Sequence, residues 1–557
     1  MRSSEGPVRA QWRPGFGVVA LAAVPVATLL VFFALPVGGM VVRGLWVDGS
    51  FEPLEALEVL TRSRTHRVLW FTVWSAAVAT LATLVLGLPL TFVLYRLRLP
   101  GRRLLRALVV VPFVMPTVVV GVAFRTLLAP SGPFGALGLD GTPLAIIAAM
   151  VFFNLAVVVR TVGGLWEHLD PRREQAAAAL GASPWQVLWT VTLPALTPAL
   201  VSAASVVFLF CATAFGVVLT LGGLRYATVE TEIYLLTTQF LDLRAAAALS
   251  FLQLVVVTGL LVAAHVGRSH REHALDRSSA ESVARSPRRT DLPALAMSVL
   301  SMVLVLAPIA ALVTGSLQVG DGWGFDHYRA LGSRREDSPL LVPVSEALGN
   351  SWKVAVDAAL LAMLLGCLVS VVVSRTGRGR KERRTLSVLD GVFMLPLGVS
   401  AVTLGFGFLI TLDRPPLDLR SSPLLVPIAQ AMVALPLVVR TLTPVLRSID
   451  PRQRQAAAAL GASPLRVFGT VDLPTVWRPL LAATGFALAV SLGEFGATSF
   501  LSRAEQPTMP VVIYQLIGHP GADNYGMALA AAVVLALLTT ILMALVERLR
   551  LGSLGAF

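Results

Sequence analysis

Charged residues are scarce in this chain: of its 557 residues only 14% are Asp, Glu, Lys or Arg, whereas 55% are hydrophobic. A soluble protein cannot keep so much apolar surface away from water, but a protein surrounded by lipid need not. The composition therefore excludes an ordinary soluble protein and predicts one that crosses a membrane several times.

Cysteine is almost absent, since the chain has only Cys211 and Cys367, each alone within an apolar run. Two isolated cysteines give neither a disulfide framework nor a cluster of metal ligands, so we expect both to be small packing residues. The chain also lacks the HExxH, CxxC and GxSxG motifs of common metal, redox and hydrolytic sites. We therefore expect no catalytic residue, no bound metal and no cofactor on this chain, which is not an enzyme.

Lysine is nearly absent as well. A phosphate-binding loop of the form G-x4-G-K-[ST] needs a lysine directly after a glycine. Lys353 follows a tryptophan and Lys381 follows an arginine, and these are the only two lysines. The chain cannot be a conventional ATPase, so any ATP that drives it must be bound by a separate polypeptide.

The net charge of +13 is carried almost wholly by arginine. An excess of positive charge can indicate nucleic-acid binding, but these arginines lie in short loops between apolar runs. Positive residues in such loops normally face the cytosol and set the orientation of a membrane protein. We expect a membrane topology signal here, with lipid rather than nucleic acid as the surrounding partner.

Apolar runs long enough to cross a bilayer, which takes roughly 20 residues, recur along the whole chain. They predict an all-α polytopic membrane protein with about twelve transmembrane helices in two sets of six. The first run follows Arg2, Arg9 and Arg13 but is too long for a signal peptide, so we expect it to be retained. The runs lie near residues 16–42, 67–95, 105–129, 143–165, 197–222, 245–267, 293–316, 349–374, 389–411, 423–446, 478–502 and 524–546.

The two sets are separated by a polar segment rich in Arg and Ser, without apolar periodicity. We expect a first transmembrane half at residues 1–267, a cytosolic linker at 268–292 and a second half at 293–557. Basic clusters at 96–106 and 375–384 favour both chain termini on the cytosolic side of a bacterial inner membrane. An even number of spans in each half makes the halves parallel repeats, related by an axis along the membrane normal.

One ten-residue string, QAAAALGASP, occurs at residues 175–184 and again, 280 positions later, at residues 455–464. In the predicted topology both copies lie in cytosolic loops, between the fourth and fifth helices of their halves. Loops usually diverge, so a loop that is the same in both halves suggests that each half meets an equivalent partner there.

The residues of this loop predict its local structure. Asp170 and Asp450, each followed by proline, are helix-start signals. The alanine-rich stretch that follows favours helix, and Gly181 and Gly461 end it as a glycine just past a helix commonly does. We expect a short helix across the cytosolic face, a sharp turn, and a rigid segment that leads into the next span. An interfacial helix without a partner is the alternative, which two matched copies disfavour.

The spacing of this loop resembles the motif E-A-A-x3-G-x9-I-x-L-P of the membrane subunits of ATP-binding-cassette importers. Both copies carry Gln in place of Glu, which removes a charge that could pair with the ATPase, and Val in place of Ile. The matching residues are Gln175, Ala176, Ala177, Gly181, Val191, Leu193 and Pro194, and again Gln455, Ala456, Ala457, Gly461, Val471, Leu473 and Pro474.

This resemblance implies a fold like that of the type I importer permeases and a function as the permease subunit that forms the translocation path. It implies that each loop helix is a coupling helix, which docks on a cytosolic ATPase present in two copies and binding the ATP. It also implies an extracytoplasmic substrate-binding protein. Fused two-half permeases of this size resemble the thiamine and ferric-iron importers, and the segment at residues 215–252 favours thiamine.

Ionisable residues within spans are candidates for the translocation path. Glu494, with its neighbours Phe495 and Gly496, is the strongest of them, because its counterpart in the first half is Ala214. The alternative is a carboxylate satisfied by a neighbouring helix. Arg125 is a further candidate, although a residue near the end of its span can also reach the membrane surface.

Two other classes of function stay open at this point. A secondary transporter can also have six-plus-six parallel repeats, but it needs buried acids for ion coupling, and Glu494 is the only good candidate in the sequence. A membrane scaffold without transport does not require a duplicated chain. Neither alternative explains the two matched loops.

Overall fold

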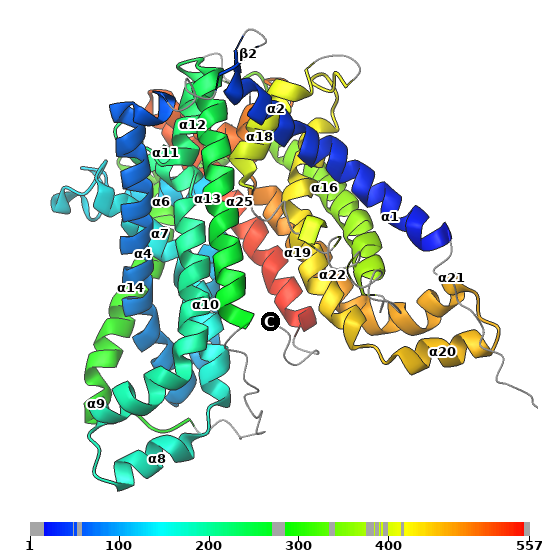
Figure 1. Ribbon diagram of the computed structural model, residues 1–557. Helices are drawn as coiled ribbons and strands as arrows, with labels where there is room; N and C mark the ends of the chain where they lie inside the picture. The colour runs from blue at the N-terminus through cyan, green and yellow to red at the C-terminus, as the bar shows by residue number, and fades with distance from the viewer. Residues whose placement is uncertain are drawn as a thin grey trace, which may run out of the picture.

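A computed structural model describes residues 16–47, 50–52, 58–269, 284–333, 340–374, 384, 389, 391–393, 399–413 and 417–550 (Figure 1). Nearly every element within these residues is a helix, and the strands form two hairpins of two residues per strand. The expectation of an all-α polytopic membrane protein is confirmed.

The first half holds its elements in the following order. They are α1 (Phe16–Leu29), η1 (Leu30–Ala34), α2 (Leu35–Leu45), β1 (Trp46–Val47), β2 (Ser50–Phe51), α4 (Ser63–Arg96), α5 (Arg102–Val114), α6 (Thr117–Leu128), η2 (Gly135–Leu137), α7 (Pro143–His168), α8 (Pro171–Ala179), α9 (Pro184–Val187), η3 (Leu188–Thr192), α10 (Leu193–Ala212), α11 (Gly216–Gly222), α12 (Val229–Thr238) and α13 (Leu243–Ser269).

The second half repeats this order. Its elements are η4 (Arg289–Asp291), α14 (Leu292–Leu317), β3 (Gln318–Val319), β4 (Gly322–Trp323), α15 (Asp326–Ala330), α16 (Val344–Val373), α18 (Ala401–Thr411), α19 (Leu425–Ser448), α20 (Pro451–Ala459), α21 (Pro464–Val467), η6 (Phe468–Asp472), α22 (Leu473–Gly493), α23 (Thr498–Leu501), α24 (Met509–Gly518) and α25 (Ala522–Arg550).

Each of the twelve expected apolar runs holds a helix, but not all of these helices are spans on their own. Within the described residues nine helices are long and apolar enough to cross a membrane, or ten if one bent pair counts as a single span. The runs near 245–267 and 389–411 contain shorter apolar helices, Leu243–Gly259 and Ala401–Thr411. Residues 394–398 of the second of these runs lie outside the described part of the chain.

The run near 105–129, expected as one helix, is instead two helices that meet at an angle of 106°. The break falls at Met115, whose backbone is extended with ψ of 135°. Pro116 follows it, and a proline both lacks an N–H and disfavours helical geometry in the residue before it. The sequence signal for the break was therefore Pro116, at the centre of an uninterrupted apolar run.

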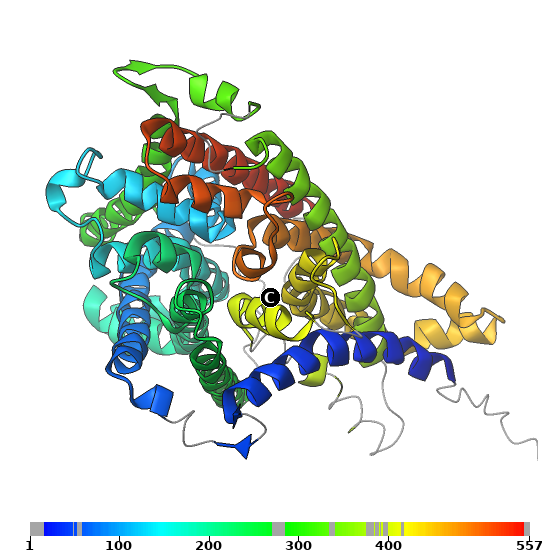
Figure 2. The same ribbon diagram turned by 90° about the horizontal axis from the view of Figure 1, so that it is seen from above.

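The first helix of each half packs against the opposite half. In Figure 1, α1 lies along α16, and α14 lies along α4 at the other side of the molecule. Contacts between α2 and α18, and between α14 and α6, extend this exchange. Figure 2, from above, shows the β3–β4 hairpin and the second loop with α20 projecting from different edges. The exchange of first helices joins the halves into one body.

The described end of the predicted linker lies against the first half. Arg285 forms a parallel bridge with Leu97, and Arg98 N donates to Arg285 O at 2.9 Å. The Arg285 guanidinium holds Asp291 in two hydrogen bonds of 2.7 Å, which lower the pKa of that carboxyl. Residues 270–283 and the basic segment 375–383 lie outside the described residues, so the domain boundaries stay a prediction.

The contact between α2 and α18 gives a test of this packing with a matched control. A Cβ on Gly39 would meet the methyl group of Thr411, whereas a Cβ on the adjacent Gly38 would meet nothing within 4 Å. We expect Gly39→Val to destabilise the protein by about 1–3 kcal/mol, because overpacking displaces one helix from the other.

Thermal unfolding in detergent checks this expectation, with Gly38→Val as the control. The packing described above requires a lower unfolding midpoint for Gly39→Val than for Gly38→Val. Equal midpoints would show that α2 and α18 do not meet at Gly39.

Candidate functional site: the repeated loops and the contact between the halves

The first loop (residues 170–194) and the second loop (residues 450–474) lie at the same end of the molecule, on opposite sides (Figure 1). Each begins with a nine-residue helix, α8 or α20, in which no residue is buried. Asp170 and Asp450 cap these helices, and each side chain accepts from the backbone N–H two residues later at 2.9 Å. The expected capped helix is present in both halves.

A left-handed glycine ends each of these helices. Gly181 has a φ of +88° and Gly461 a φ of +84°. The residue after each glycine donates its N–H to an alanine carbonyl five residues earlier, at 3.1 Å in both loops. These bonds satisfy carbonyl groups that a helix end leaves without partners. Residues with a Cβ rarely adopt this φ, so the direction in which the chain leaves the helix depends on glycine.

A second short helix then leads into the membrane. Ser183 caps α9 in a reciprocal pair with Gln186, whose Oε1 accepts from Ser183 N at 2.7 Å. A π-helical segment follows in each loop, η3 or η6, and continues without a break into α10 or α22. The remaining motif residues, which are Val191, Leu193 and Pro194 with Val471, Leu473 and Pro474, all lie in this continuous lead.

A polar cross-brace joins the loop helix to its lead in both halves, with the charges exchanged. In the first loop Thr192 donates to Glu174 at 3.0 Å, and Arg96 lies 2.5 Å from the same carboxylate. In the second loop Arg454 Nε lies 2.6 Å from Asp472, whose side chain is fully buried. The brace prevents the loop helix from pivoting independently of the lead.

Sequence reasoning missed this brace. Glu174 and Arg454 occupy equivalent positions, as do Thr192 and Asp472. A search for exchanged residue types at the repeat distance of 280 positions would have found both pairs together, because one position of each loop changes whenever its partner does.

The tips of both loops carry large apolar side chains in the open. Leu180 is 90% exposed and its counterpart Leu460 is 89% exposed. Trp185 and Leu465, also equivalent, are exposed too. Exposed apolar side chains at matched sites indicate a surface for a protein partner. Gln175 and Gln455 are exposed beside them, and Ala176, Ala177, Ala456 and Ala457 complete the helical surface between the caps.

Glu494, the predicted path residue, lies in the break between α22 and α23. Its carboxylate is buried and accepts from Ala497 N at 2.7 Å, from Thr498 N at 3.0 Å and from Thr498 Oγ1 at 2.5 Å. Gln430 on α19 donates to Thr498 at 3.1 Å and extends this chain of bonds. The carboxylate caps α23, which resembles the satisfied state considered as the alternative. A role for Glu494 in translocation stays a prediction.

Phe495 meets its counterpart from the other half. The rings of Phe215 and Phe495 stack, with centroids 5.3 Å apart and planes at 22°. Tyr234 and Tyr514, equivalent to one another, lie 6.5 Å apart edge to face, and each also packs on the phenylalanine of its own half. Two pairs of repeated aromatic residues therefore meet across the boundary between the halves. Phe215, Tyr234, Phe495 and Tyr514 are named here the aromatic contact.

The other predicted path residues have different surroundings. Gly496 lies close to α18, where an added Cβ would be 2.9 Å from Ala401 Cβ. Arg125, near the end of α6, is exposed, and no hydrogen bond or ion pair within the described residues joins it to Glu494. The structure thus brings Phe495 and Gly496 into the boundary between the halves with Glu494, but not Arg125.

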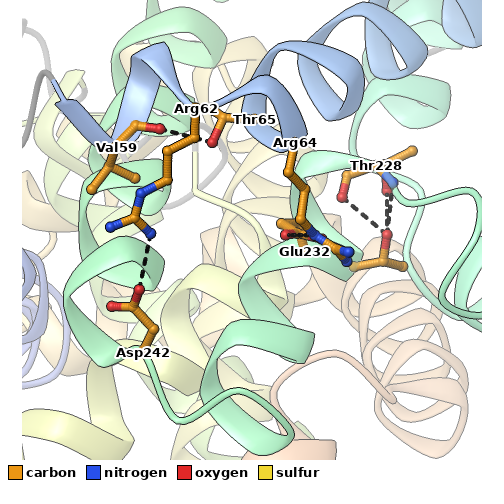
Figure 3. A network of polar contacts seen from close by, with 8 residues as sticks. Val59, Arg62, Arg64, Thr65, Thr228, Glu232 and Asp242 are labelled. Carbon is orange, nitrogen blue, oxygen red and sulfur yellow. Dashed lines mark hydrogen bonds and ion pairs between the residues drawn. The ribbon is translucent and has the colours of Figure 1, made fainter.

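Glu494 is not the only buried acid, so that part of the sequence analysis is wrong. Glu232 on α12 is 2% exposed and holds Arg64 through two hydrogen bonds of 2.5 and 2.8 Å (Figure 3). Arg62 pairs with Asp242 in the same network, which ties the start of α4 to α12 and α13. Short apolar helices such as α12 gave no span signal, so their acids were not considered.

Glu230, one turn-face away on the same helix, is fully buried and reaches the second half. Its carboxylate accepts from Ser400, the N-cap of α18, at 2.8 Å and also from Gln253 on α13. This bond joins α12 to α18 across the boundary between the halves. Pro510 stands at the equivalent position of the second half, so the link is present once.

Comparison with known proteins follows the same division of the chain. A family model described as "Binding-protein-dependent transport system inner membrane component" matches twice, at residues 83–271 and 362–551. The thiamine transport system permease protein ThiP of Brucella abortus (strain 2308) is 27% identical over 504 residues, which cover 88% of this chain and 89% of that protein.

Two further relatives differ in the substrate that their names give. ThiP of Escherichia coli (strain K12) is 26% identical over 499 residues, covering 86% of this chain and 88% of that protein. The sulfate transport system permease protein CysT of the same strain is 36% identical over 201 residues, covering 35% of this chain and 73% of that protein. The sulfate permease thus matches a part of the chain, whereas the thiamine permeases match most of it.

The brace of the second loop can be tested by double substitution. We expect Arg454→Ala to destabilise the protein by about 1–3 kcal/mol, because it deprives a buried carboxylate of its cation. Replacing Asp472 as well removes the buried charge, so Arg454→Ala/Asp472→Ala should be less destabilised than the single variant. Thermal unfolding midpoints in detergent measure both, with Arg452→Ala, at an exposed position of the same helix, as the control.

The opposite order, with the double variant less stable than Arg454→Ala, would show that the two side chains do not act as a pair.

Proposed function

The chain belongs to the family of binding-protein-dependent transport system inner membrane components and is the permease subunit of an ATP-binding-cassette importer, and we propose that it imports thiamine. Two family matches, one in each half, account for the repeat. The membership sets aside the secondary transporter and the scaffold that the sequence alone left open. It also identifies the cellular location as the inner membrane.

The proposed partners are a cytosolic ATPase in two copies, which binds the ATP, and an extracytoplasmic substrate-binding protein. The observation that supports two ATPase copies is the pair of matched loops, each with a capped helix, a glycine turn and an exposed leucine. Loops that dock on a cytosolic ATPase must face the cytosol, which fits an inside location for both chain termini. Gln175 and Gln455 would meet the ATPase as neutral donors and acceptors rather than as carboxylates.

Each loop is joined to the aromatic contact by one helix. The lead of the first loop continues into α10, which ends at Ala212, three residues before Phe215. The lead of the second loop continues into α22, which ends at Gly493, two residues before Phe495. A displacement of α8 relative to α20 is therefore carried along a stiff element to the place where the halves touch.

We infer that closure of the two ATPase copies moves the loops and separates the stacked rings of Phe215 and Phe495. A two-state bundle is biased in this way by whatever binds one state better than the other. In the described structure the rings are stacked and buried, so the aromatic contact is closed. The bond of Glu230 to Ser400 lies across the same boundary and has to break or rearrange when the halves separate.

Thiamine is supported over other substrates by the extent of the similarity, since both thiamine permeases match most of this chain. Thiamine is an aromatic cation, and aromatic faces and carboxylates are the groups that attract such a cation. The aromatic contact and the buried acids Glu230, Glu232 and Glu494 offer both kinds of group near the boundary between the halves. Ferric iron, which the run at residues 491–514 resembles equally, is the second candidate.

Uptake into proteoliposomes tests the substrate. The complex of this chain with its ATPase, supplied with its binding protein and internal ATP, should accumulate labelled thiamine. Unlabelled thiamine should compete, whereas sulfate and ferric iron should not. Accumulation of sulfate or iron in place of thiamine would contradict the proposed substrate and leave the importer assignment in place.

A further inference from the structure

A small cavity of about 170 Å³ lies in the second half, between the end of α18, the start of α19 and the segment after α23. Its walls include the apolar side chains of Phe408, Leu412 and Phe500. Arg420, Arg503 and Ser502 supply its polar groups. The cavity could hold a few water molecules, each of which takes about 30 Å³ in the liquid, or one short side chain.

The polar groups of this cavity lack partners. Neither the Arg420 nor the Arg503 guanidinium makes a hydrogen bond or ion pair to another described side chain, although Arg503 is partly buried. The Ser502 hydroxyl is buried and has no hydrogen-bond partner. Two cations side by side repel one another, and a buried hydroxyl without a partner costs free energy. All three groups can donate to a single anion.

The first half has no such cavity chemistry at the equivalent positions. Asp140 stands where the second half has Arg420, and Gly223 stands where it has Arg503. The next position but one is reversed as well, with Arg225 in the first half and Glu505 in the second. The halves are alike in their loops and aromatic residues but opposite in charge here, so this end of the molecule meets a partner that is not two-fold symmetric.

The cavity lies at the far end of the molecule from the two loops. Arg420 precedes α19, a helix of 24 residues whose other end leads directly into α20 of the second loop. A helix of that length spans about 36 Å, which is the thickness of a bilayer core or more. Figure 1 shows α18 and α20 at opposite ends accordingly. With the loops in the cytosol, the cavity faces outward.

We propose that this cavity is the acceptor for an acidic side chain of the extracytoplasmic substrate-binding protein. The proposal rests on the proposed function, because it needs the loops in the cytosol and such a partner outside. Two arginines and a hydroxyl suit the two oxygens of a carboxylate, and the apolar walls exclude competing water. Because only the second half carries the cavity, it also distinguishes the two ways in which a two-lobed partner can sit on the two halves.

Charge reversal at the cavity tests the proposal in the reconstituted full complex. We expect Arg503→Glu to raise the concentration of loaded binding protein that half-saturates ATP hydrolysis by about tenfold or more, because a buried like-charge contact replaces a paired one. ATP hydrolysis without binding protein should be unchanged. Arg329→Glu is the control, since it makes the same charge change at an exposed residue of α15 and should have little effect.

A second arm identifies the partner residue. Substituting acidic surface residues of the binding protein one at a time by arginine should yield one variant that is impaired with the wild-type permease and restored with Arg503→Glu. An equal loss in Arg329→Glu and Arg503→Glu, or no restoring variant, would overturn the proposal. A loss that instead follows the anionic lipid content of the vesicles would assign the cavity to a lipid headgroup. If binding protein fails to stimulate even the wild type, the proposed function fails rather than the cavity.

Discussion

The rest of the structure depends on the stiff attachment of each exposed loop helix to the span that follows it. Gly181 and Gly461 adopt a left-handed backbone that sends the chain back toward the membrane, and the brace made by Glu174 or Arg454 stops the helix from turning about that point. A helix of nine residues without buried side chains has little stability of its own. Its caps and brace make it a part of the spanning helix, so that a force on one is a force on the other.

The way the halves are joined turns this stiffness into a two-state device. The first helix of each half packs on the other half, which holds the chain together while the central helices move. Between them the contact is small and repeated: Phe215 with Phe495 and Tyr234 with Tyr514, related by the same distance in sequence as the loops. The symmetry ends at polar residues. Glu230 and Glu494 each occur in one half alone, and Arg420 and Arg503 give one half an outward charge that the other lacks.

The sequence carried more of the fold than of the site. Apolar runs and the duplicated string predicted the helices, the repeat and the caps, because these depend on local residues such as Asp170 and Gly181. The break at Met115 was signalled by Pro116 but hidden in an apolar run. The brace, the acids of α12 and the stacking of Phe215 on Phe495 could not be predicted from one half read alone, because they depend on which segments meet in space. Comparing equivalent positions, such as Glu174 with Arg454, recovers part of this information.

The most direct test of the account is whether the glycine turns are needed for the ATPase to act on the permease. Gly181→Val/Gly461→Val introduces side chains at a φ where L-residues are strained by about 1–2 kcal/mol each, and Gly164→Val, at an open helical position, is the control. ATP hydrolysis stimulated by binding protein is measured in the reconstituted complex alongside the ATPase that co-purifies. The account predicts loss of both in the double variant and wild-type values in the control. A double variant that keeps its ATPase and its stimulation would contradict it.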